Sequence, residues 1–211
     1  MSMMGELTFF LGLQVKQLKD GTFISQTKYT RDLMKKFGVE ASRPDITYVV
    51  GVCARFQSSP KESHMTAAKR ILRYLKGSEG VDLWYTKEGG FKLMGYSDSD
   101  YAGCRIDRKS TSGTCQMLGN RLISWFGKKQ NSIATSTTEV EYIAAGSCCA
   151  QILWMRQQLR DYDVEENHIA KKDITLEYIS TDKQLADIFT KPLCESRFEE
   201  LKNDLGLIEL S

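Results

Sequence analysis

Residues 91–126 read FKLMGYSDSDYAGCRIDRKSTSGTCQMLGNRLISWF, and this stretch decides the expected fold. Short runs rich in β-forming residues alternate here with turns that contain glycine. Consecutive short strands joined by tight turns predict an antiparallel meander. The expected strands, including one immediately upstream, are Val81–Thr86, Phe91–Ser97, Gly113–Leu118 and Arg121–Phe126.

Helical patterns follow the meander. Ser136 and Glu139 form a capping box, which predicts a long helix that runs to about Tyr162. The elements expected downstream are a strand at Ile174–Ile179, a helix capped by Thr181 and Gln184 that runs through Phe189, and a last helix with Phe198, Leu201 and Leu205 that ends at Gly206. This mixture of strands and helices predicts an α/β (α+β) fold.

The residues before the meander predict a hairpin followed by a helix. Asp20-Gly21 is a strong turn signal between the strand-forming runs Leu7–Leu18 and Thr22–Ser25. A helix is expected over Lys28–Phe37 with its C-cap at Gly38. Periodicity leaves the apolar run in Ala41–Phe56 undecided between helix and strand.

A clearer helix follows at residues 59–77. Ser59 is the expected N-cap, Pro60 the first helical residue and Glu62 the capping-box partner, while Gly77 ends the helix. The apolar stripe of this helix consists of Met65, Ala68, Ile71, Leu72 and Leu75.

The composition is that of a globular protein. The 211 residues are 41% hydrophobic and 27% charged, with a formal charge of +2, so broad disorder and a polybasic tail are excluded. No run approaches the roughly 18 apolar residues of a membrane span. No secretion signal opens the sequence, and the six cysteines show no Cys-x-x-Cys spacing, so we expect reduced thiols in an intracellular (cytoplasmic or nuclear) protein that is not secreted.

Acidic residues occur on three separate expected elements. Asp98 and Asp100 lie at the end of a strand and on the same face of it. They either bind a divalent cation or are ordinary solvated turn residues. Glu139 and Glu141 lie on opposite sides of the long helix, and Glu139 is engaged in the capping box, so Glu141 is the candidate there. Together with Asp187, this pattern is typical of a metal-dependent phosphodiester site.

Long blocks of this sequence resemble a known family. The blocks YSDSDYAGCRIDRKSTSG (96–113), SWFGKKQ (124–130), STTEVEYIAA (136–145) and QLADIFTKPL (184–193) closely resemble the ribonuclease H region of Ty1/copia-type retrotransposon Pol polyproteins, particularly those of plants. Upstream, GELTFFLGLQV (5–15), SRPDI (42–46) and ARFQSSPKESHMTAAKRILRYLKG (54–77) resemble the end of the reverse transcriptase and its connecting segment.

The resemblance implies a fold, an ancestral activity and a set of site residues. It implies a ribonuclease H-like mixed sheet with flanking helices, which ancestrally cuts the RNA strand of RNA–DNA hybrids with Mg²⁺ or Mn²⁺. The catalytic and metal-binding acids carried over are Asp98, Glu141 and Asp187. The implied domains are residues 1–80 (a reverse transcriptase-derived hairpin and helix), 81–193 (the ribonuclease H-like domain) and 194–211 (a C-terminal helix and tail).

One acid of the family's four-carboxylate site has no counterpart. The family presents this third Asp on a central strand, but residues 163–173 are too few for a strand and a helix, which indicates an internal deletion. We therefore expect Ile174–Ile179 to pair in parallel with Phe91–Ser97. The acids within the short link, Asp163, Glu165, Glu166 and Asp173, stand in no motif that would position them.

Three interpretations of function remain open at this point. The chain is a Pol relic whose ribonuclease H site is weak or dead, a still active hybrid nuclease that uses a link acid, or a co-opted binding module. No polymerase motif occurs, so polymerase activity is not expected. The expected partners are an RNA–DNA hybrid or other nucleic acid, other Pol segments or a second copy, and no membrane. The expected nucleic-acid contacts are Lys69, Arg73, Arg105, Arg108, Lys109, Lys128 and Lys129.

Overall fold

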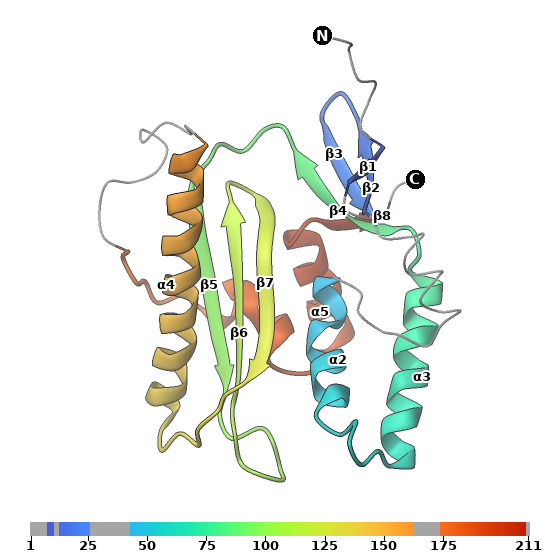
Figure 1. The fold of residues 1–211 in the computed structure, drawn as a ribbon, viewed down its shortest axis with the longest axis vertical. Helices are drawn as coiled ribbons and strands as arrows, with labels where there is room; N and C mark the ends of the chain where they lie inside the picture. Colours follow the sequence, from blue (N-terminus) through green and yellow to red (C-terminus); the bar gives the residue numbers. More distant parts are fainter. Residues whose placement is uncertain (1–7, 11–12, 26–42, 163–173, 210–211) are drawn as a thin grey trace. The chain divides into compact units, whose positions relative to one another are not determined.

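The structure, a computed structural model, describes residues 8–10, 13–25, 43–162 and 174–209 (Figure 1). The chain forms two compact units. The first unit comprises residues 1–88 and 202–211, and the second comprises residues 89–201. The sequence-based division instead falls after residues 80 and 193. The expected helix at Lys28–Phe37 and the acids of residues 163–173 lie outside the described residues.

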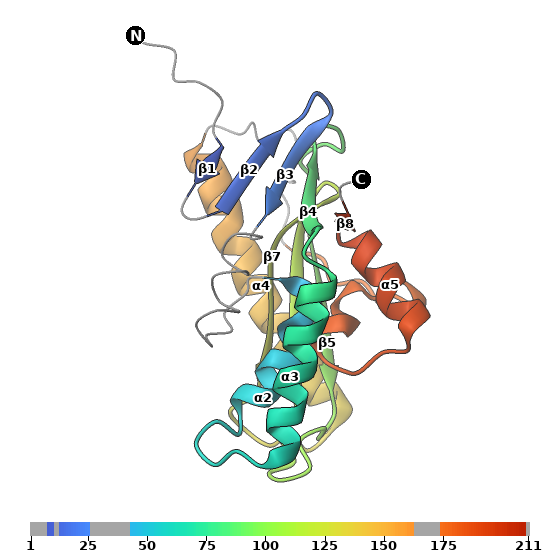
Figure 2. The ribbon, with the colours of Figure 1, turned by 90° about the vertical axis from the view of Figure 1, so that its right-hand side faces the viewer.

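The first unit contains an antiparallel sheet with the strand order β1-β2-β3-β4-β8 (Figure 2). Its strands are β1 (Phe9–Phe10), β2 (Leu13–Gln17), β3 (Gly21–Ser25), β4 (Val81–Thr86) and β8 (Leu207–Glu209). The hairpin at Asp20-Gly21 is confirmed, because Gln17 pairs with Thr22. The single strand expected at Leu7–Leu18 is wrong, because Phe10 pairs back with Leu13.

Strand β4 leaves the expected meander. It pairs with β3 on one side and β8 on the other, instead of with the next strand along the chain. The rings of Phe23 and Trp84, on neighbouring strands, pack with their centroids 4.4 Å apart. This apolar contact favours the long-range pairing over a local hairpin.

Helices complete the first unit. The undecided run Ala41–Phe56 forms a 3₁₀ turn, η1 (Pro44–Ile46), and helix α2 (Thr47–Ala54). Helix α3 (Glu62–Gly77) ends where the sequence predicts, but its N-cap is Lys61 instead of Ser59, and the His64 side chain accepts a hydrogen bond from the Lys61 N–H. Ile46, Ile71 and Leu75 form a buried cluster, whereas Met65 is exposed and does not join it.

The second unit is built on a three-stranded antiparallel meander, as the sequence predicts (Figure 1). Its strands are β5 (Leu93–Asp100), β6 (Thr111–Leu118) and β7 (Arg121–Lys129). The turn between β6 and β7 contains Gly119, whose positive φ of 64° suits glycine. The two sheets and the helices confirm the α+β class.

Helical segments pack on both faces of this meander. Helix α4 (Thr137–Asp161) packs on β5 and β6, and a Cβ at Gly95 would lie only 2.5 Å from the Cys148 Sγ of α4. On the other face, a Cβ at Gly113 would lie 2.7 Å from the Cβ of Phe189 in η3 (Leu185–Phe189). Gly95 pairs in register with Gln116, which is three residues from Gly113 on β6, so the two glycines lie on opposite faces of the sheet.

The predicted strand Ile174–Ile179 does not form. Residues 174–180 are irregular, and neither they nor any other described residues pair in parallel with β5. The expected mixed sheet is therefore wrong for the described part of the chain, where all strand pairs are antiparallel. The segment instead lines a pocket beside Ser97, and Gln184 donates a side-chain hydrogen bond to the Ser97 carbonyl at 3.0 Å.

The remaining C-terminal elements are short. The helix expected over residues 181–189 is two 3₁₀ turns, η2 (Thr181–Lys183) and η3, and the cap of η3 is Gln184, which accepts from the Ala186 N–H. The last helix is confirmed as α5 (Glu195–Asp204), and strand β8 follows it after Gly206. No helix among the described residues is long and apolar enough to span a bilayer.

Candidate functional site

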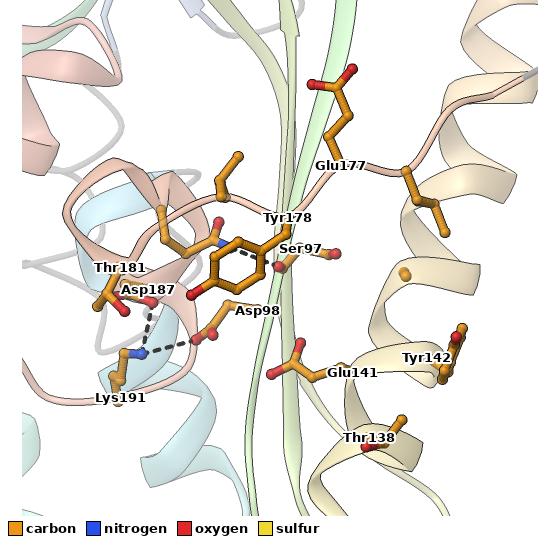
Figure 3. A pocket seen from close by; sticks show the side chains of 14 residues that line it. Ser97, Asp98, Thr138, Glu141, Tyr142, Glu177, Tyr178, Thr181, Asp187 and Lys191 are labelled. Atoms are coloured by element: carbon orange, nitrogen blue, oxygen red, sulfur yellow. Dashed lines mark hydrogen bonds and ion pairs between the residues drawn. The ribbon is translucent and has the colours of Figure 1, made fainter.

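Three carboxylates from three elements line one pocket of about 480 Å³ (Figure 3). Asp98 comes from β5, Glu141 from the first turns of α4, and Asp187 from η3. Asp98 faces the side of the sheet on which η3 packs, while Glu141 approaches from α4. The residues that the sequence singles out on separate elements therefore meet in space.

The two aspartates are held by residues that follow η3. The Thr190 hydroxyl donates a hydrogen bond to Asp98 Oδ2. The Lys191 ammonium lies 2.7 Å from Asp187 Oδ1 and 3.4 Å from Asp98 Oδ2. Both carboxylates are nearly buried, and the single cation between them offsets part of their combined negative charge.

The charges around Lys191 favour its protonated form. Burial lowers the pKa of Lys191, but the hydrogen bond to Asp187 and the charge of Asp98 outweigh burial, and the net pKa is raised above 10.5. Burial also raises the pKa of Asp187, which Lys191 opposes. The pocket therefore contains a charged ammonium at neutral pH.

Glu141 has a strongly raised pKa. Its pKa is raised from 4.5 to about 7, first because of partial burial and second because of the negative charge of Asp98. The Ser99 backbone hydrogen bond and the charge of Lys191 lower it in part. Glu141 is therefore close to half protonated at neutral pH in the metal-free protein.

Replacing Glu141 with glutamine is expected to stabilise the metal-free protein at pH 8. The folded state holds the Glu141 proton up to about pH 7, while the unfolded chain releases it near 4.5, so wild-type stability falls as pH rises between these values. The side chain retains solvent contact, so we expect a gain of about 1 kcal/mol, below the roughly 3 kcal/mol that the shift alone would imply. Urea denaturation at pH 5 and pH 8 measures the difference, which should shrink at pH 5.

The Glu139→Gln variant is the matched control, with the opposite sign. The pKa of Glu139 is lowered because the Thr135 N–H and hydroxyl donate to its carboxylate. The stabilisation from Glu139 is present above its ordinary pKa of 4.5 and is lost as pH falls through the lowered value. Glu139→Gln should therefore be less stable than wild type at pH 8. Parallel pH dependences for the two variants would contradict the assignment.

The structure separates the acids that the sequence grouped. Glu141 lines the pocket, whereas Glu139 contacts Thr135 outside it, as the helical geometry predicts. Asp100 does not line the pocket, and its carboxylate accepts a hydrogen bond from the Thr111 N–H instead. Asp100 therefore stabilises the start of β6.

Sequence reasoning missed other residues of the pocket. Lys191 is the most important of them, and the signal in the sequence that could have found it is its four-residue spacing from Asp187, just beyond the end of the predicted helix. Glu177 also lines the pocket, but its carboxylate points away from the other three acids (Figure 3). Gln184, which ties η3 to the β5 backbone, was noted only as a helix cap.

The basic residues fall into two groups. Arg105, Arg108, Lys109, Lys128 and Lys129 belong to the second unit, in the loop between β5 and β6 and at the end of β7. Lys128 and Lys129 pair in register with Ser112 and Thr111, so they lie at the same end of the sheet as Asp98, which pairs with Gly113. Lys129 forms an ion pair with Asp107 at 2.7 Å. Lys69 and Arg73 lie on α3 in the first unit.

The pocket fits a small divalent cation only in part. Among the described residues, no three His, Cys, Asp or Glu side chains converge closely enough to hold one ion. Mg²⁺ is commonly bound by one or two carboxylates together with water and phosphate oxygens. Asp98 and Asp187 supply such a pair, and Asp187 Oδ1 is a buried oxygen whose partner in the structure is the Lys191 ammonium. Asp98 and Asp187 are therefore the residues that would hold a metal, and Glu141 lines the same pocket.

Comparison with known proteins places the chain in a family. It is 27% identical over 279 residues to a retrovirus-related Pol polyprotein from transposon RE1 of Arabidopsis thaliana, and the match covers 96% of this chain. It is 32% identical to the corresponding polyprotein from transposon TNT 1-94 of Nicotiana tabacum, over 81% of the chain. The chain belongs to the Pol polyprotein family of plant Ty1/copia retrotransposons.

This member of the Pol family spans about a fifth of the length of these relatives, 19% of the RE1 polyprotein and 16% of the TNT 1-94 polyprotein. A shorter relative, an uncharacterised mitochondrial protein of Arabidopsis thaliana, is 30% identical over 72% of this chain and is itself covered to 79%. No family model matches the chain, and no solved structure matches it.

The lengths of the matched regions bear on the internal deletions. The match to the RE1 polyprotein runs over 279 residues, whereas the present sequence has 211. The RE1 relative therefore carries residues inside the matched region that this chain lacks. A shortened, retrotransposon-derived Pol fragment accounts for both the similarity and the difference.

Proposed function

We propose that residues 89–201 form a ribonuclease H-type unit that binds RNA–DNA hybrids through metal and backbone contacts and has little or no cleavage activity. The observation that carries this proposal is the meeting of Asp98, Glu141 and Asp187 in one pocket, each from a different element. Three such acids are the donor set expected for a metal-dependent phosphodiester site.

The roles of the residues follow from their positions. Asp98 and Asp187 would hold the metal, which when bound polarises a phosphoryl oxygen and activates water. Glu141 sits across from Asp98 with a pKa of about 7, so it can accept or release a proton near neutral pH. Thr190 restricts Asp98 to one orientation through its hydrogen bond.

The same geometry argues for weak turnover. A two-metal clamp stabilises both the attacking and the leaving oxygen, and it needs more ligands than three carboxylates supply. Glu177, the other acid that lines the pocket, points away from Asp98 (Figure 3). The expected result is binding of a hybrid without efficient cleavage.

Hybrid binding would rest on exposed cations of the same unit. Arg105, Arg108 and Lys128 are exposed side chains of the second unit, in the β5–β6 loop and on β7. Contacts to the phosphate backbone require placed cations and carry no sequence information, which suits recognition by shape. Lys69 and Arg73 of the first unit stay predicted contacts, with no position assigned relative to the pocket.

The test combines cleavage and binding in one protein preparation. A labelled RNA–DNA hybrid is incubated with the full chain and with Asp98→Asn, in Mg²⁺ or Mn²⁺, and binding is followed by fluorescence anisotropy. We expect salt-sensitive binding by both proteins, with cleavage by wild type at or just above the Asp98→Asn background. Arg105→Ala should weaken binding and reduce the slope of log affinity against log salt concentration by about one. Lys183→Ala, in η2, should do neither.

Two outcomes would contradict the proposal. Efficient cleavage that Asp98→Asn abolishes would show an active nuclease with a rebuilt site. Failure of the folded chain to bind the hybrid at low salt would exclude a hybrid-binding unit and leave a protein-interaction module as the remaining interpretation.

A further inference from the structure

A lysine side chain lies where the pocket would place a metal ion. Lys191 Nζ approaches Asp187 Oδ1 at 2.7 Å and Asp98 Oδ2 at 3.4 Å, and Figure 3 shows it between the two carboxylates. The two carboxylate side chains are only 3% and 12% exposed. Two nearly buried acids this close together stay ionised together only with a cation beside them.

The oxygens of the two aspartates converge on one point for separate reasons. Asp98 Oδ2 is oriented by the Thr190 hydroxyl, and Asp187 Oδ1 is buried in η3, where the Lys191 ammonium is its partner at 2.7 Å. Lys191 is tied to the same turn, because its backbone N–H donates to the Asp187 carbonyl at 3.3 Å. The ammonium is therefore tethered next to the position that the carboxylates create.

We propose that the Lys191 ammonium occupies a divalent-cation position between Asp98 and Asp187, so that a metal ion and this ammonium exclude each other there. The inference deepens the proposed function and rests on its metal chemistry, but not on cleavage. A Mg²⁺ or Mn²⁺ ion bound by these oxygens would lie about 2.1 Å from them, and the ammonium contacts the same two oxygens. A metal ion and an ammonium held by the same oxygens would repel each other strongly in a partly buried site.

Exchange between the two cations is possible because of the lysine stem. The Lys191 side chain is 39% exposed, and its flexible four-carbon stem allows the ammonium to move into solvent or onto a nucleic-acid phosphate. The metal affinity of this pocket is then set by competition with its own lysine. Metal would bind best when a phosphate has drawn the ammonium away.

Mn²⁺ binding to the full chain tests this competition without nucleic acid. Free Mn²⁺ is titrated by electron paramagnetic resonance in wild type, Lys191→Met, and the matched control Lys183→Met, which removes a lysine charge from the neighbouring η2. Lys191→Met should bind Mn²⁺ at least about tenfold more tightly than wild type, because the competing cation is gone. Lys183→Met should bind as wild type does, and adding Asp98→Asn to Lys191→Met should abolish the gain.

Equal Mn²⁺ affinity of wild type and folded Lys191→Met would overturn the inference, as would tighter binding that Asp98→Asn leaves intact.

A second measurement uses wild type alone, in case the variant fails to fold. Mn²⁺ should accelerate acylation of Lys191 by an amine-reactive ester, mapped by mass spectrometry with Lys183 as internal reference; an unchanged rate would refute the exchange. The outcome is independent of the cleavage test, so a failed nuclease assay does not decide it.

Discussion

Replacing Asp45 with alanine is expected to lower the free energy of unfolding by about 3–5 kcal/mol, because it leaves a buried guanidinium without its counter-ion. Arg43 and Asp45 are 7% and 4% exposed and form two hydrogen bonds, at 3.1 and 2.6 Å. The Tyr74 hydroxyl donates to the same carboxylate at 2.6 Å, and Arg43 also donates to the Ser78 carbonyl at 2.7 Å. Urea denaturation followed by circular dichroism measures the loss.

The double variant Arg43→Met, Asp45→Leu is the control for this prediction. It removes both charges, so it should be less destabilised than the sum of the two single variants, which reveals the coupling between them. Hydrogen exchange of residues 43–78 should locate the loss in the first unit. A loss below about 1 kcal/mol for Asp45→Ala would show that the pair is solvated and contributes as a surface ion pair does.

Replacing Gly113 with valine is expected to cost about 3 kcal/mol and to separate η3 from the sheet. A Cβ at this position would lie 2.7 Å from Phe189 Cβ and Thr190 Cγ2, and 3.0 Å from the Ala186 carbonyl oxygen. These atoms lie on or next to the backbone, so side-chain rotation cannot relieve the overlap. Since Asp187 and Thr190 move with η3, hydrogen exchange of residues 185–191 should rise together with the loss of stability.

Gly146→Ala is the matched glycine substitution. Gly146 lies inside α4, and an added Cβ there would meet no atom within 4 Å. Alanine should therefore raise stability by about 0.5–1 kcal/mol through its better helix propensity. If Gly113→Val were as well tolerated as Gly146→Ala, the close approach of η3 to β6 would be wrong.

Local signals predicted much of the second unit. The glycine turn after β6, the capping serine of α4 and the alternating strands of the meander are each determined by residues within a few positions, so sequence reasoning found them. It also selected Glu141 over Glu139, because helical geometry places them on opposite sides of the helix and the capping box engages Glu139. The strand expected at Ile174–Ile179 failed, because an apolar run of strand length has no partner specified in its own sequence.

The pocket was predicted by its acids but not by its cation. Asp98, Glu141 and Asp187 are recognisable one at a time, through a strand end, a helix face and a motif. Lys191 became part of the site only when η3 packed on β5 and brought Asp187 next to Asp98. From spacing alone, Lys191 reads as an ordinary helix-surface partner of Asp187.

The sequence by itself determined the α+β class, the meander, the long helix, the family and the three acids, because short-range chemistry and motif blocks specify them. Only the tertiary structure decided that β4 pairs with β3 and β8, that residues 174–180 line a pocket without forming a strand, and that Lys191 lies between two aspartates. These features depend on contacts between residues distant along the chain. Their free energies come from packing and burial of charge, which no local pattern encodes.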